Sequence, residues 1–148
     1  FKDFIDVHKI NWKLFCSNPN SILYFEKYPE KFRELEKTKK ILWSNLSSNP
    51  GAIPILEKNL DKIEWEIFCT NPEAIPLLEQ NLDKIDWSYL SWNPNALHLI
   101  EREPDRIDWL RLSINPNALY LLERKPDRVD WEFLSRNPFI FEEDHACK

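Results

Sequence analysis

The chain contains 148 residues, which fits one domain, and 43% of them are hydrophobic, enough to build a core. A single glycine leaves little room for tight β-hairpins, and a net charge of −5 argues against nucleic acid, which binds basic faces. No run of about 18 apolar residues occurs, so we expect no membrane partner.

A tandem repeat of 22 residues organises the sequence. Its markers are a Trp and, six residues later, an Asn-Pro pair. The Trp positions with this step are Trp43, Trp65, Trp87, Trp109 and Trp131. An earlier copy contains Trp12 and Asn18-Pro19, 31 residues ahead of the next. Because a fixed period is typical of repeat architectures, we predict a single repeat domain over residues 1–148. Its repeats lie at about 10–32, 42–63, 64–85, 86–107, 108–129 and 130–148.

The first repeat is followed by an insertion at about 33–42. The segment from Pro29 to Leu42 is rich in Glu, Lys and Arg. Leu42 replaces the Asp that caps the first helix in later repeats. We therefore predict a longer helix here that runs into Trp43.

A later repeat, read from Asp86, predicts two short helices. Asp86 suits the N-cap of a first helix, and Trp87 and Leu90 fall on one face of it. Asn93-Pro94 ends this helix and starts the second, with Asn as N-cap and Pro as the first helical residue. Helices this short are marginal alone and must stack. The sequence therefore predicts an all-α solenoid of stacked helix–turn–helix repeats.

Two prolines conflict with this pattern. Pro54 and Pro76 fall five residues into the predicted second helix. An internal proline removes a backbone hydrogen bond, so we expect a bend at each. Both lie opposite the apolar face, where a bend is best tolerated.

The repeats resemble the short tandem repeats common in proteins of giant DNA viruses that infect amoebae. The pattern Leu-Ser-x-Asn-Pro-x-Ala-Ile-x-Leu-Leu-Glu-x-Asn-x-Asp-Lys-Ile-Asp-Trp runs from Asn71 to Trp87 and again from Asn115 to Trp131. The segment from Asn137 to Glu142 is also similar to C-terminal repeats of that family. The resemblance covers nearly the whole chain apart from the insertion and the tail. It implies a helical solenoid of giant-virus origin, in host cytoplasm or associated with the virion. It implies no activity and no functional residues.

The sequence offers no strong candidate for chemistry. Recurring Glu, Asp and Lys or Arg positions share equivalent environments, whereas a catalytic carboxylate pair needs two different ones. We interpret these rows as caps and ion pairs. The three His are scattered and no Cys-x-x-Cys occurs. We expect no catalytic, cofactor-binding or metal-binding residues, and no enzyme.

The cysteines favour a reducing compartment. Cys16 and Cys69 share a repeat position with Ser47, Ser91, Ser113 and Ser135. That position favours a small side chain near the core, so we expect no disulfide there. Three cysteines without a framework are typical of a cytoplasmic protein.

The predicted function is a non-catalytic scaffold that binds a viral or host protein, and a homo-oligomer is possible. The recurring Trp residues are expected in the core, and Trp92 is the exposed exception. We expect the partner on outward positions of the C-terminal repeats. These positions are Tyr89, Trp92, His98, Arg111, Ile114, Tyr120, Phe133 and Arg136. Aromatic and Arg side chains of this kind are enriched in interface hot spots.

The alternative function is a small-molecule or peptide-binding accessory with its site at the insertion, residues 33–42. An apolar stripe on the surface would favour the scaffold, and a closed cleft near Arg33 to Leu42 would favour the accessory.

Overall fold

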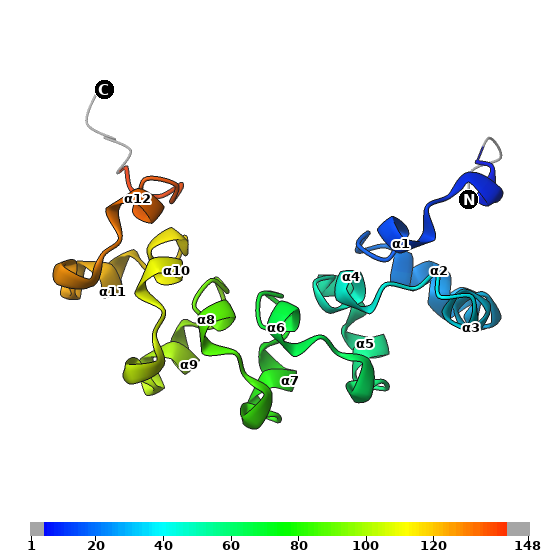
Figure 1. Ribbon diagram of the computed structural model, residues 1–148, viewed down its shortest axis with the longest axis horizontal. Coiled ribbons are helices and arrows are strands. Elements are labelled where there is room, and N and C mark those ends of the chain that lie inside the picture. Colours follow the sequence, from blue (N-terminus) through cyan, green and yellow to red (C-terminus); the bar gives the residue numbers. More distant parts are fainter. Residues whose placement is uncertain (1–4, 142–148) are drawn as a thin grey trace, which may run out of the picture. The chain divides into compact units, whose positions relative to one another are not determined.

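The computed structural model describes residues 5–141, and over these residues the chain is all-α (Figure 1), as predicted. The α-helices are α1 (Trp12–Phe15), α2 (Ser21–Lys27), α3 (Pro29–Lys37), α4 (Trp43–Ser47), α5 (Ile53–Leu56), α6 (Trp65–Phe68), α7 (Ile75–Glu79), α8 (Trp87–Leu90), α9 (Leu97–Arg102), α10 (Trp109–Ile114), α11 (Leu119–Arg124) and α12 (Trp131–Leu134). The 3₁₀ helices are η1 (Val7–Lys9), η2 (Pro50–Ala52), η3 (Leu60–Lys62), η4 (Leu82–Lys84), η5 (Pro104–Arg106) and η6 (Pro126–Arg128). No strand occurs within the described range.

The chain forms two compact units, an N-terminal unit that ends at Ala74 and a C-terminal unit that begins at Ile75. Within the N-terminal unit α4 packs beside α6, and within the C-terminal unit α10 packs beside α12. Successive first helices are therefore neighbours inside each unit.

The first helix of each later repeat is capped as expected. The carboxylates of Asp86, Asp108 and Asp130 accept backbone N–H bonds from the residues three positions on. These bonds satisfy N–H groups that have no partner inside the helix.

The second helix begins later than predicted. The Asn93 side chain accepts the N–H of Asn95 at 2.9 Å, which makes a turn, and α9 begins only at Leu97. Asn93 is therefore not the N-cap of the second helix, and Pro94 is not its first residue. An Asn side chain readily forms such a local turn, and this competes with helix initiation.

The prediction of helix bends at Pro54 and Pro76 is wrong, because these second helices also begin later than expected. Each proline is the second residue of its helix, α5 or α7. An N–H in the first turn has no partner within the helix, so a proline there costs no hydrogen bond. Both prolines are exposed, as predicted.

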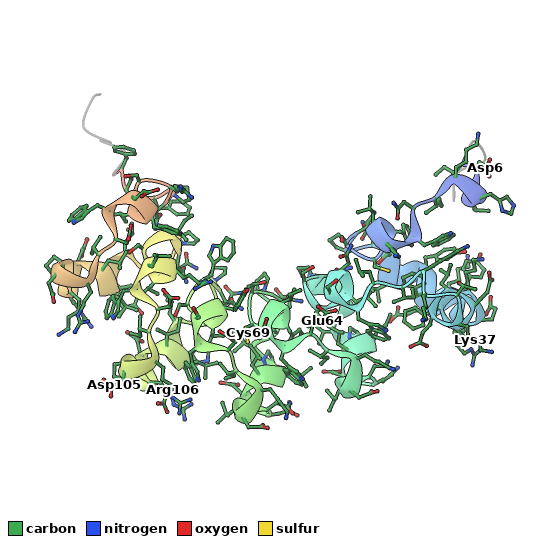
Figure 2. All side chains as sticks on the ribbon, viewed as in Figure 1. Asp6, Lys37, Glu64, Cys69, Asp105 and Arg106 are labelled. Atoms are coloured by element: carbon green, nitrogen blue, oxygen red, sulfur yellow. The ribbon has the colours of Figure 1, made fainter. Side chains whose placement is uncertain are left out.

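The inserted helix does not run into Trp43. It ends at Lys37 (labelled in Figure 2), and Lys39 has a positive φ of 54°. The N–H of Lys40 bonds to the carbonyl of Leu35 at 2.8 Å, a bond that closes the helix end as a Schellman motif does. Leu42 is extended and makes no side-chain cap for α4.

A ladder of buried asparagines joins the repeats within each unit. The Asn71 side-chain nitrogen donates to the carbonyls of Ser47 and Asn49, at 3.0 and 3.1 Å. Equivalent pairs of bonds leave Asn49, Asn115 and Asn137. The oxygen of each Asn accepts the N–H two residues on, for example that of Glu73. The amide is therefore satisfied at both ends, which a buried polar group requires.

The serine position forms a second link between repeats. The Ser91 hydroxyl accepts the N–H of Asp108 at 3.1 Å and donates to the Trp87 carbonyl at 2.8 Å. Ser113 does the same with Asp130 and Trp109. The expected small side chain near the core is confirmed, and its hydroxyl explains why Ser is so frequent there.

The residue three after the Trp is fully buried in four of the repeats, and apolar side chains of the second helices, such as Leu56, Leu78 and Ile100, complete the core. Leu46, Phe68, Leu90 and Leu112 have no exposed surface. The expectation that the recurring Trp form the core is confirmed only for Trp12, which is 8% exposed. Trp131 is 68% exposed, and the remaining recurring Trp are half-buried. A half-buried indole still covers the repeat edge: the Arg106 guanidinium lies 5.3 Å from the centre of the Trp87 ring.

Candidate functional site

The candidate site lies in the C-terminal unit, on the row of first helices α8, α10 and α12. Figure 1 shows these helices along one side of the unit, with α9 and α11 along the other. Six of the predicted residues lie on these helices or, for Trp92 and Arg136, two residues after the helix end. They are Tyr89, Trp92, Arg111, Ile114, Phe133 and Arg136. His98 and Tyr120 belong to the second row, on α9 and α11. The structure therefore divides the predicted site into two groups.

Arg111 connects α10 to α8 at the centre of the first row. Its guanidinium lies 5.1 Å from the centre of the Tyr89 ring. The same group donates to the Ser88 hydroxyl at 2.5 Å and to the Asp108 carboxylate at 2.6 Å. The Ser88 hydroxyl also donates to the Asp108 carboxylate. Tyr89 and Arg111 are therefore held in place before any partner binds.

Two opposing effects act on the pKa of Asp108. Partial burial raises the pKa. Hydrogen bonds from Ser88 and Arg111, together with the positive charge of Arg111, lower the pKa by more than burial raises it. The net pKa lies below the usual value for an aspartate. The carboxylate is therefore charged at neutral pH and fixes the position of the guanidinium.

The position five residues after the Trp is held by Trp92, Ile114 and Arg136 in the last three repeats. Trp92 is 50% exposed, as predicted, and Ile114 is half-buried. The Arg136 guanidinium lies 5.2 Å from the centre of the Phe133 ring and 3.4 Å from Glu132. Trp and Arg side chains are enriched among the residues that contribute most to protein–protein binding.

His98 and Tyr120 instead contact the preceding repeat. The His98 ring lies 3.2 Å from the Glu79 carboxylate. Burial and a hydrogen bond with Glu101 raise the pKa of Tyr120. The sequence analysis did not predict these contacts. A signal for them exists, because a Glu recurs three residues after the outward position of each second helix, as Glu101 follows His98.

Other candidate groups fall outside this face. Cys16 and Cys69 are buried, while Cys147 and His145 lie outside the described residues. Cys69 follows the end of α6 (Figure 2). Residues 5–141 contain no cluster of His, Cys, Asp and Glu that could hold a metal ion. None of the described helices has the length and apolar character to cross a membrane.

A surface hollow of about 340 Å³ lies in the N-terminal unit, between α2, α3 and α5. Its lining combines apolar and charged side chains. They are Phe25, Glu26, Pro29, Phe32, Arg33, Pro54, Ile55, Lys58 and Asn59. Of the insertion, Arg33 reaches this hollow. Glu34 and Lys40 of the insertion line a second hollow of about 520 Å³, together with Trp12 and Tyr24.

Comparison with known proteins found no matching family model, no matching curated protein and no matching solved structure.

Proposed function

We propose that the chain is a non-catalytic scaffold that binds a protein partner along the first-helix row of its C-terminal unit. The observation that carries this proposal is the half-exposed Trp92, which lies three residues after Tyr89 and at the repeat position that Ile114 holds in the next repeat. Aromatic side chains bury large areas at little entropic cost, which favours them as binding anchors.

The fixed position of Arg111 supports the same proposal. Its contacts with Ser88, Tyr89 and Asp108 order the centre of the face in the free protein. A face that is already ordered loses less conformational entropy when a partner binds. The giant-virus resemblance of the repeats adds that the partner is a viral or host protein, met in the cytoplasm or in the virion.

The test is selection of peptides from a random display library on the immobilised chain, followed by measurement of Kd for purified peptides. We expect Trp92→Ala to weaken binding at least about tenfold. Leu82→Ala is the matched control, because Leu82 is also 50% exposed but lies on η4. Equal Kd values for wild type and Trp92→Ala would reject this face as the binding site.

A second candidate function rests on the hollow between α2, α3 and α5. The Phe25 and Phe32 rings beside Arg33 and Lys58 suit a peptide with apolar and acidic side chains. In the same selection, peptides that lose affinity for Arg33→Ala and keep it for Trp92→Ala would support this site over the first-helix row.

A further inference from the structure

A hollow beside the recurring Trp belongs to the repeat itself. In the fourth repeat, a hollow of about 290 Å³ is lined by Trp87 and by the residues 12 and 19 positions after it, Leu99 and Arg106. In the first repeat, the hollow of about 520 Å³ (the Trp12 hollow) is lined by the equivalent residues, Trp12, Tyr24 and Lys31. Because the fourth repeat is internal, such a hollow does not arise from an uncovered end.

The hollow beside Trp87 is balanced in charge. Its lining contains two basic and two acidic side chains, those of Arg102, Arg106, Asp83 and Glu103. The Arg106 guanidinium lies 3.7 Å from the Glu103 carboxylate and 5.3 Å from the centre of the Trp87 ring. The charges of this hollow therefore balance without a ligand.

The Trp12 hollow instead has an excess of positive charge. Lys13, Lys31 and Lys40 line it together with a single carboxylate, that of Glu34. Glu34 pairs with Lys31 at 2.9 Å, and the ammonium groups of Lys13 and Lys40 form no ion pair within residues 5–141. This excess is a local exception in a chain whose net charge is −5.

The insertion and one substitution produce the difference in charge. Lys39 has a φ of 54°, in the left-handed region, and the N–H of Lys40 then bonds to the carbonyl of Leu35 at 2.8 Å. The chain therefore folds back toward α3, which places Lys40 at the hollow. His8, also in the lining, stands at the position where the later repeats have Asp, as at Asp83. Both changes remove negative or add positive charge.

We propose that the Trp12 hollow binds a small organic phosphate, a function separate from protein binding by the first-helix row. Lys13, Lys31 and Lys40 hold the phosphoryl group, because an ammonium is a compact point charge that suits phosphate. A phosphate monoester carries roughly −1.5 to −2 charge and three acceptor oxygens, which matches three ammonium groups better than a carboxylate does.

The rest of the lining accommodates the organic part of the ligand. Val7, Ile10 and Tyr24 provide apolar surface beside the lysines. The volume of about 520 Å³ falls within the roughly 300–1,000 Å³ that is usual for small-molecule sites. A ring on the ligand therefore adds affinity by leaving water.

The test is calorimetric titration of the full chain with phenyl phosphate at low ionic strength, where screening is weak. We expect a Kd below about 1 mM. Inorganic phosphate lacks the ring and should bind at least about fivefold more weakly. Equal Kd values for the two probes, or no binding of phenyl phosphate at about 10 mM, would overturn the proposal.

Two pairs of variants locate the site. Lys40→Gln should weaken binding at least about fivefold, and it keeps the turn because the bond that closes it uses the backbone of Lys40. Lys37→Gln is the matched control, since Lys37 is exposed at the end of the same helix but does not line the hollow. Equal weakening by both would mean general attraction to lysines and would also overturn the proposal.

Glu34→Gln should have the opposite effect and strengthen binding, because it removes the carboxylate that competes for Lys31. Glu30→Gln is its control, since Glu30 is exposed on α3 away from the lining. Weaker binding by Glu34→Gln would contradict a phosphate held at Lys31. Circular dichroism of each variant verifies that helix content is kept, and Lys31→Gln repeats the test of Lys40→Gln at a second lysine.

Discussion

At the residue scale, the Asp108 carboxylate has two roles, a helix cap and an ion pair, which a substitution can separate. Its one carboxylate oxygen caps α10 by accepting the N–H of Arg111 at 3.1 Å, and its other oxygen holds the Arg111 guanidinium. Asp130 caps α12 in the same way but has Phe133 where Asp108 has Arg111. The two residues therefore form a natural pair for comparison.

Asp108→Asn should keep the cap, because Asn caps helices as well as Asp does, and remove the charge. We expect a loss of roughly 0.5–1.5 kcal/mol in the free energy of unfolding at pH 7, measured by urea denaturation. The folded-state pKa of Asp108 lies below its usual value. Its stabilising contribution is therefore complete above the usual pKa of about 4 and is lost as pH falls through the folded pKa.

The difference in stability between wild type and Asp108→Asn should consequently shrink between about pH 5 and pH 2. Asp130→Asn is the control and should cost less at pH 7. A difference that stays constant down to pH 2 would show that the charge of Asp108 contributes nothing.

At the element scale, two side chains of α8 share one helix face but differ in burial. Leu90 has no exposed surface, whereas Trp87 is only half-buried. The Trp87 indole nitrogen is also shielded from water and bonds to no acceptor within residues 5–141. A shielded donor without a partner reduces the stability that the ring contributes.

Leu90→Ala should therefore cost more than Trp87→Ala, the reverse of what side-chain size indicates. We expect about 2–5 kcal/mol for Leu90→Ala, about 1–3 kcal/mol for Trp87→Ala, and under about 1 kcal/mol for Trp92→Ala. Urea denaturation midpoints at constant m-value measure all three. If Trp87→Ala were the costliest of the three, the core would be centred on the Trp positions after all.

The helical period predicted the first helices and the exposure of Trp92, because spacing alone determines which residues share a face. The role of Asn93 was not predictable in this way. An Asn before a Pro suits both a helix N-cap and a turn, and only the positions of neighbouring repeats decide between them. The partial burial of Trp87 is likewise set by the residues packed over it, such as Arg106, rather than by its own position.

At the scale of the whole molecule, the repeats place most contacts between neighbours. The Asn115 side chain bonds only to its own turn and to the repeat before it. In such proteins stability is approximately a sum over repeats and over the interfaces between neighbours. A defect in one interface should therefore loosen the structure locally.

Asn115→Asp tests this locality, because its carboxylate would face the carbonyls of Ser91 and Asn93. The repulsion should open the interface between the fourth and fifth repeats. Native-state hydrogen exchange should then accelerate in residues 86–130, at least about tenfold, and change little in residues 5–74. Asn117→Asp is the matched control: Asn117 is exposed, and its side chain makes one bond, to the carbonyl of Pro94. A uniform acceleration across both units would mean that the chain unfolds as one cooperative body, and the nearest-neighbour description would not apply to it.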